Sequence, residues 1–261
     1  MKWYEKFVLK AEDGIGFEVL DGTNGELIIR ARNIEKTNVY SKNYIYPPIL
    51  EGYKYVCGEW NNGFVIERRS DGSQFVWIPV GSLDSNGTLD GEHFSEKFGR
   101  RSYNSNEFSD NGYHEALNGE LLEQFESVKK YGGFYISRYN ISKNSEGKPQ
   151  SVKGVKPWVN INFDDAKKIA STIEDNEAVK SHLTFGAEYD SVLECSRQAG
   201  KLLVEFVKDS NEWTQECYRS SYHVFRGRFH DSYGFYYPFD FRGISMSATN
   251  LTGFRAALYI K

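Results

Sequence analysis

The feature that most restricts how this chain can fold is an aromatic-rich run near its C-terminus, residues 218–243. Ten of these 26 residues are Tyr or Phe, and no Leu, Ile or Ala accompanies them. From residue 225 onward the run has neither helical nor strand periodicity. Rings without aliphatic companions cannot fill a core at normal density in relaxed rotamers. We therefore expect most of these rings to form an exposed patch, and such a patch normally marks an interaction site.

The amino-acid types of this run are those of antibody binding loops. The run holds Tyr, Phe, Ser, His, Arg, Gly, Asp, Val and Pro, and it lacks the Lys and Glu that are common in the rest of the chain. In antibody binding sites, rigid rings supply contact area at low entropic cost, and small polar residues adapt around them. We expect Phe225 and Phe241 to be framework rings. The predicted contact residues are Tyr222, Arg228, Phe229, His230, Asp231, Tyr233, Phe235, Tyr236, Tyr237, Phe239 and Asp240.

Length and charge narrow the class of protein. A chain of 261 residues can hold one main domain and a small appendage. The net charge of -4 provides no basic surface for a phosphate backbone, so nucleic acid is not expected as a partner. The N-terminal residues carry charges where a signal peptide needs an apolar stretch, and no later run is long enough to span a bilayer. We expect a cytoplasmic protein without a signal peptide or membrane insertion.

The chain is predicted to consist of a small β-rich N-terminal segment, residues 1–48, and a main domain, residues 49–261. The first segment has short alternating runs separated by Asp-Gly and Asn-Gly turn signals, which favour β-hairpins. Pro47 and Pro48 mark the boundary. The main domain opens with strand-like runs, followed by a long polar stretch, residues 81–115, that is typical of a surface loop.

Helical periodicity predicts three helices in the main domain. The first follows Asn118, a potential N-cap. Its apolar face is formed by Leu121, Leu122, Phe125 and Val128. The second is capped by Asn162, with Asp165 reaching back, and the third covers residues 184–199. No helix is expected after Trp213, and the chain is predicted to be loop from there to a closing strand at the C-terminus.

The cysteines and histidines give little indication of catalysis or metal binding. The cysteines are Cys57, Cys195 and Cys217. They form an odd, widely spaced set without the C-x-x-C spacing of zinc or redox sites, which indicates reduced and mostly packed thiols, with Cys217 as a nucleophile left open. His230 stands beside Asp231, but sequence neighbours rarely form a working dyad. His182 is expected to be a core or helix-entry residue.

The order of several short motifs resembles that of the formylglycine-generating-enzyme (sulfatase-modifying-factor) family, a branch of the C-type-lectin fold. In chain order the motifs are FVWIPV, YGGFYISRYNIS, PWVNINFDDAKKIA, SHLTFGAEYDSVLECS, NEWTQE, Arg-Gly and GFRAALYIK. The resemblance covers residues 51–261. It implies an α+β domain with two to three helices packed on small antiparallel sheets, paired N- and C-terminal strands, and long irregular loops on one side.

Individual motifs match that family in part. The segment DSNEWT, residues 209–214, stands where the family pattern reads Gly-Asn-Val-Trp-Glu-Trp-Thr, and only its last three residues match. Arg226-Gly227 matches the start of an Arg-Gly-Gly motif, in which an Arg replaces the second glycine, and Gly-Phe-Arg at residues 253–255 matches fully. We expect structural roles here: Trp213 in the core, the glycine of Arg-Gly in a turn, and Arg255 bonded internally to a carboxylate.

The resemblance leaves two activities of related proteins without their residues. A formylglycine-generating oxidase needs a thiolate pair to hold copper. One cysteine of the family directly follows Gly-Phe-Arg, where this chain has Ala256, and no cysteine lies after Cys217. The calcium-ligand strings of sugar-binding lectins, such as Glu-Pro-Asn, do not occur. Glu212 and Asp209 could still hold a structural Ca²⁺, but we expect capping without a metal, and no cofactor is predicted.

Within this fold, the aromatic run resembles the mutated cassette of variable proteins of diversity-generating retroelements in phages and bacteria. Its missing residues include Lys, Glu, Gln, Met and Trp, whose codons cannot end in a pyrimidine, and randomising the adenines of Asn codons would exclude them. The resemblance implies a non-catalytic variable protein or a phage tail receptor binder whose residues 218–243 bind a protein or a glycan. A phage- or prophage-associated setting would favour a homo-oligomer. The alternative is an enzyme of the formylglycine-generating type with an atypical site.

Overall fold

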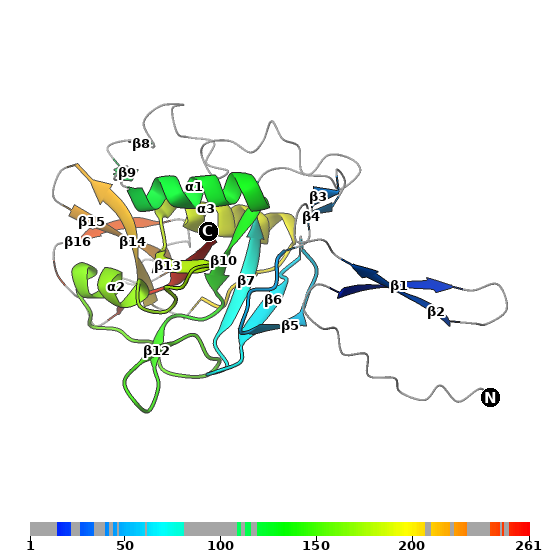
Figure 1. Cartoon of the computed structure of the whole chain (residues 1–261). Coiled ribbons are helices and arrows are strands. Elements are labelled where there is room, and N and C mark those ends of the chain that lie inside the picture. Colours follow the sequence, from blue (N-terminus) through cyan, green and yellow to red (C-terminus); the bar gives the residue numbers. More distant parts are fainter. Residues whose placement is uncertain are drawn as a thin grey trace. The chain divides into compact units, whose positions relative to one another are not determined.

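The computed structural model (Figure 1) describes the following residues: 15–21, 27–33, 40–41, 44–45, 47–60, 62–80, 109–110, 113–115, 119–206, 210–219, 222–228, 241–245, 247 and 251–261. The chain divides into two compact units, Met1–Tyr46 and Pro47–Lys261, and each is described by itself. The division falls beside Pro47 and Pro48, where the sequence placed a boundary.

The described part of the first unit consists of two antiparallel strand pairs. These are β1 (Ile15–Asp21) with β2 (Leu27–Asn33), and β3 (Tyr40–Ser41) with β4 (Tyr44–Ile45). Antiparallel pairs joined by short connections are what the Asp-Gly and Asn-Gly turn signals of this segment indicate.

The second unit is a mixed α+β structure in which most strand pairs are antiparallel. The strands of its first sheet are β5 (Tyr53–Cys57), β6 (Val65–Arg68), β7 (Gln74–Pro79), β10 (Gly133–Ser137), β13 (Val179–Leu183) and β18 (Ala256–Ile260). Their order is β13-β18-β10-β7-β6-β5, and every neighbouring pair is antiparallel. The central strands β18 and β10 are buried throughout, so this sheet forms the middle of the unit.

The C-terminal strand lies in the interior of this sheet. β18 consists of five buried residues and pairs with both β10 and β13. Among the described strands, β5 pairs only with β6, and it exposes Lys54 and Tyr55, which suits an edge strand. The expected pairing of the N- and C-terminal strands is therefore wrong, because the apolar strand takes a central place and the half-polar strand takes an edge.

A second sheet lies where the sequence predicts mainly loop. Its strands are β8 (Ser109–Asp110), β9 (Tyr113–Glu115), β14 (Ser210–Tyr218), β15 (Tyr222–Arg228), β16 (Arg242–Ser245) and β17 (Thr252–Phe254). The order is β16-β15-β14-β9-β8, and β17 runs parallel to β14. A separate small hairpin is formed by β11 (Ser142–Lys143) and β12 (Pro149–Gln150). The prediction of loop after Trp213 is wrong, as is the loop prediction for β8 and β9.

Strand β14 cannot be recognised from the sequence because both of its faces are buried. Its first seven residues are all buried, and Trp213 is the one apolar residue among them. Polar side chains on both faces remove the alternation by which a strand is recognised. They are tolerated in the interior because they have partners there, as Glu216 has in Arg226 and Glu212 has in Arg255.

The described part of the second unit contains three helices, α1 (Gly119–Tyr131), α2 (Phe163–Ala170) and α3 (Gly186–Gln198). Figure 1 shows α1 and α3 on the same side of the first sheet, with α2 apart from them. Leu121 and Val128 of α1 and Val192 of α3 pack with Ile78 and Ile136 of the sheet in one hydrophobic core. This core fixes the sheet that supports the rest of the unit.

The three predicted helices are confirmed, with small changes. Asn162 caps α2, since its Oδ1 accepts the Asp165 backbone N–H at 2.7 Å. Asn118, the expected cap of α1, lies outside the described residues. Leu122 was assigned to the apolar face of α1, but it is 55% exposed, so that face is narrower than predicted.

Candidate functional site

Strands β15 and β16 flank the predicted binding segment. They pair antiparallel from His223↔Ser245 to Arg226↔Arg242, and residues 229–240 lie between them in the sequence. The aromatic run itself begins at Tyr218, the last residue of β14, so two paired strands of the second sheet precede and follow its residues 229–240.

The predicted contact residues fall into two groups. Tyr222 and Arg228 belong to β15; Tyr222 is 38% exposed, and the backbone of Arg228 pairs with Ser210. The other nine lie outside the described residues, and their roles stay predictions. These are Phe229, His230, Asp231, Tyr233, Phe235, Tyr236, Tyr237, Phe239 and Asp240.

Four charged side chains, here called the ion quartet, meet where β15 and β16 lead into residues 229–240. The members are Arg226, Arg242, Glu216 and Asp190. Arg226 Nε donates to Glu216 Oε2 at 2.8 Å, and its Nη2 donates to Asp190 Oδ1 at 2.6 Å. Arg242 Nε lies 3.1 Å from Glu216 Oε1, and its Nη2 lies 3.7 Å from Asp190 Oδ2. Each arginine thus faces both acids, so two positive and two negative side chains meet in one cluster.

The quartet ties the β15–β16 pair to β14 through Glu216 and to α3 through Asp190. The side chains of Arg226 and Glu216 are 1% and 0% exposed. Burial alone would lower the pKa of Arg226, but Glu216 and Asp190 outweigh burial and raise it, so the guanidinium stays charged. It also lies over the ring of Tyr189, 5.5 Å from the centroid. The strands that precede and follow residues 229–240 are therefore anchored in the interior.

Two glycines let the strands of this frame approach closely. A Cβ on Gly243 would lie 2.1 Å from ring atoms of Phe225, and that ring meets Trp213 edge-on at 6.0 Å, as expected for a framework ring. Gly227 has a φ of 130°, and a Cβ there would lie 2.9 Å from the Ser210 carbonyl oxygen. Because Gly227 lies within β15, the turn predicted for it is wrong; the position requires glycine for close contact between strands.

A second buried ion pair joins two of the motifs quoted above. Arg255 Nε donates to Glu212 Oε2 at 2.8 Å, and its Nη1 donates to the carbonyls of Ser137 and Arg138 at 2.8 and 2.9 Å. Burial raises the pKa of Glu212, and the Arg255 guanidinium opposes that rise. The predicted internal bridge of Arg255 is confirmed, and Trp213, which is 1% exposed, is the predicted core residue.

Three tyrosines stand side by side on the sheet face that carries the quartet. Tyr113, Tyr218 and Tyr222 are directly opposite one another in the register of β9, β14 and β15, so their side chains share one face. We call them the tyrosine row. The ring centroids of Tyr113 and Tyr218 are 4.8 Å apart. The guanidinium of Arg242 lies 5.0 Å from the centroid of Tyr113, and that of Arg219 lies 5.1 Å from the centroid of Tyr218.

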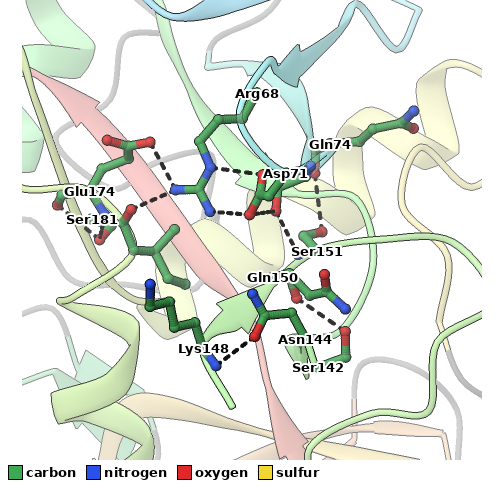
Figure 2. A network of polar contacts seen from close by, with 12 residues as sticks. Arg68, Asp71, Gln74, Ser142, Asn144, Lys148, Gln150, Ser151, Glu174 and Ser181 are labelled. Atoms are coloured by element: carbon green, nitrogen blue, oxygen red, sulfur yellow. Dashed lines mark hydrogen bonds and ion pairs between the residues drawn. The ribbon is translucent and has the colours of Figure 1, made fainter. Parts of the chain in front are cut away.

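The polar network in Figure 2 links the first sheet to the segment between α2 and β13. Arg68 donates through Nε to Asp71 at 2.9 Å and through Nη1 to Glu174 at 3.0 Å and to the Ile173 carbonyl at 2.7 Å. Its Nη2 also bonds Asp71, and the Tyr53 hydroxyl donates to Glu174 at 2.6 Å. Every guanidinium nitrogen of Arg68 has a partner inside the chain, so the network braces the fold. Arg68 therefore makes its hydrogen bonds within the protein and not to a ligand in the pocket of about 430 Å³ beside it.

A pocket of about 780 Å³ lies between α1 and the end of β18. Its walls combine apolar surface with pairs of opposite charge. Lys180 lies 3.4 Å from Glu123, and Lys261 lies 3.6 Å from Asp175. These paired charges leave the pocket without a clear preference for an anionic or a cationic ligand.

His182 forms a buried pair with Glu188. Its Nε2 lies 2.9 Å from Glu188 Oε1, and both side chains are 0% exposed. Glu188 also accepts the Phe185 backbone N–H at 2.8 Å and the Gln124 side-chain amide. A substrate cannot reach this pair, so His182 is the predicted core residue and not a general base.

The three thiols are free. Cys57 is exposed, Cys195 is buried, and Cys217 is half-buried, so the prediction of packed thiols holds for two of them. Burial raises the pKa of Cys195 to about 12 and also raises the pKa of Cys217. Since the thiolate is the nucleophile, these pKa values disfavour Cys217 in that role.

The described residues contain neither a cluster of metal-binding side chains nor a helix that could span a membrane. Within those ranges, no group of three or more His, Cys, Asp and Glu side chains could hold a metal ion. Glu212 is bonded to Arg255, and Asp209 lies outside the described residues, so the calcium pair suggested by the sequence is not seen together. The absence of a cofactor stays a prediction. No helix in the described part of the chain has the length and apolar character needed to cross a bilayer.

No protein-family model, no curated protein and no solved structure matches this chain. The α+β class therefore rests on the structure itself, and any finer assignment of fold or function is a proposal.

Proposed function

We propose that this chain is a non-catalytic ligand-binding protein that presents residues 218–243 as a diversified, aromatic-rich surface on a C-type-lectin-type scaffold. Its ligand is a protein or a glycan. It would act as a variable protein of a diversity-generating retroelement or as a phage tail receptor binder. The observation that carries the proposal is that residues 229–240 of this run are preceded and followed by paired strands, β15 and β16, which the ion quartet joins.

The physical argument concerns the cost of ordering a binding surface. Aromatic side chains bind well when the backbone that carries them is already fixed, because binding then loses less conformational freedom. The quartet fixes both ends of the segment, and the packing of Phe225 on Gly243 aligns the two strands. This arrangement suits a segment whose sequence changes while its support stays constant.

We infer the C-type-lectin fold of the formylglycine-generating-enzyme type from the motif order, and contacts between the motifs support it. Glu212 of NEWT bonds Arg255 of Gly-Phe-Arg, and Trp213 of NEWT packs against Phe225, which precedes Arg-Gly. Motifs that lie far apart in the sequence thus meet in space. The enzyme alternative finds less support, because no cysteine follows Cys217 and the His182 pair is sealed from solvent.

A replacement of the segment tests the proposal. Residues 229–240 are exchanged for a Gly/Ser chain of equal length, and both proteins are screened on a glycan array and against a displayed library of random 12-residue peptides. We expect the variant to keep the melting temperature within a few degrees and to lose all binding selected on the original chain. Unchanged binding by the variant would show that the recognition surface lies elsewhere.

The genetic and cellular settings have their own tests. A reverse-transcriptase gene beside a near-copy of the cassette, with Asn codons at the differing positions, would support diversification, and an operon of metabolic enzymes would count against it. A phage-associated protein is expected to form a homo-oligomer, often a trimer, whereas a cytoplasmic binder need not. Size-exclusion chromatography with light scattering separates the two settings.

A further inference from the structure

Arg219 has an unusual backbone at the turn between β14 and β15. Its φ is 53°, and the described backbone has one other non-glycine residue at positive φ, Asn160. Asn tolerates this region, whereas a long side chain such as Arg is strained there and glycine would be favoured. Strained positions of this kind cluster at active sites, ligand-binding sites and switch regions.

The side chain of Arg219 is placed to receive an anion. Its guanidinium lies over the ring of Tyr218, and the residue is exposed. A guanidinium stacked on a ring keeps its N–H groups free at the edge of its plane, where they match the two oxygens of a carboxylate. No described carboxylate pairs with Arg219, in contrast to Arg242, which faces both acids of the quartet.

The sheet face beside this turn also carries exposed apolar side chains. Tyr222 and Ile244 are 38% and 42% exposed, and both lie on the sheet face of the tyrosine row. Through Tyr113 the row also contacts Arg242, which stands just after the end of residues 229–240. Tyr and Arg beside exposed aliphatic surface are the residues that dominate binding energy in protein interfaces.

We propose that the tyrosine row, Ile244 and Arg219 form a subsite of the binding surface, and that this subsite takes an acidic side chain of a protein ligand flanked by an apolar residue. The inference rests on the proposed function, because it assigns a ligand group to the described part of the proposed binding surface. A neutral glycan could stack on the tyrosines but would leave Arg219 without an anionic partner. The charge of Arg219 together with the exposed Ile244 therefore favours a protein.

The test uses peptides selected from the random 12-residue library on the full chain. Each selected peptide is synthesised with a twin in which Asp and Glu become Asn and Gln, and both are titrated against the original protein by calorimetry. We expect the acidic peptide to bind at least about tenfold more tightly than its twin, the effect of a charge-assisted hydrogen bond. A library that yields no binders, or only binders without acidic residues, overturns the inference.

Arg219→Gly separates binding from folding. Glycine relieves the strain at positive φ, so the variant should melt at the same or a higher temperature. It should nevertheless lose about tenfold in affinity for the acidic peptide and nothing for the twin. Arg197→Gln, at an exposed arginine of α3, is the matched control and should bind like the original chain.

The outcomes distinguish this inference from the proposed function. If the Gly/Ser variant loses the peptides while Arg219→Gly binds them unchanged, the subsite is refuted and the proposed function stands. If neither variant changes binding, both fail. Binding of sialylated or neutral glycans without any acidic peptide would also overturn the subsite, since its predicted partner is a protein.

Discussion

Replacing Arg226 with Met should destabilise the protein by about 3 kcal/mol, because it leaves a buried carboxylate without its main partner. The change removes bonds of 2.8 Å to Glu216 and 2.6 Å to Asp190. Glu216 is 0% exposed, so water cannot replace the lost donor. Arg242 remains 3.1 Å from Glu216, which keeps the loss at the lower end of the 3–5 kcal/mol typical for a broken buried pair.

A double variant tests this reasoning more sharply than the single change. Arg226→Met with Glu216→Leu removes one charge of each sign and leaves Arg242 with Asp190, whose side chain is 21% exposed and so partly hydrated. We expect the double variant to be more stable than Arg226→Met alone, because no unpaired buried charge remains. The free energy of unfolding is measured in urea by tryptophan fluorescence.

The control variant removes an arginine from an exposed ion pair instead of a buried one. Arg197→Met breaks an exposed pair with Glu194 and should cost less than about 0.5 kcal/mol. The account of the quartet is refuted if Arg226→Met costs no more than this control, or if the double variant is less stable than the single one.

Three further predictions concern the scaffold. Arg255→Met should cost about 3–5 kcal/mol at neutral pH. Burial already raises the folded-state pKa of Glu212, and losing Arg255 raises it further. The difference in free energy of unfolding between the original protein and the variant should therefore shrink as the pH falls toward the ordinary glutamate pKa of about 4.3. Urea titrations across this range would contradict the pairing if that difference stays constant. Gly227→Ala should lower the free energy of unfolding by about 1 kcal/mol more than Gly147→Ala, which has open space around its Cβ, and equal losses would refute the close strand contact. Asn162→Ala should cost about 1 kcal/mol in thermal unfolding, and no change would mean that the cap does not stabilise α2.

The helices could be predicted from the sequence because their signals are local. The cap at Asn162, the Asp165 that reaches back to it and the apolar period of α2 all lie within one short segment. The core helix α3 likewise begins within two residues of the predicted start, residue 184. Hydrophobic periodicity reports such elements reliably when one face meets a core and the other meets water.

The second sheet and the quartet could not be predicted, because their determinants are distant in sequence. Arg226 belongs to the Arg-Gly motif, and its partner Asp190 lies on α3. Nothing in the sequence around Asp190 indicates that it bonds a residue of a strand much later in the chain. Glu216 looked like a residue of a polar loop because its burial depends on an arginine from another strand. Tyr113 was assigned to a loop, and only the register of β9 with β14 places it beside Tyr218.

A junction in which both arginines already have carboxylate partners has a practical consequence for protein engineering. Foreign sequences grafted in place of residues 229–240 would begin and end beside arginines that already have carboxylate partners in the sheet and in α3, so the insert would not have to supply these partners. The unit Pro47–Lys261 would then serve as a recipient for designed recognition loops, and its tolerance could be measured by how many unrelated inserts still yield a cooperatively melting protein.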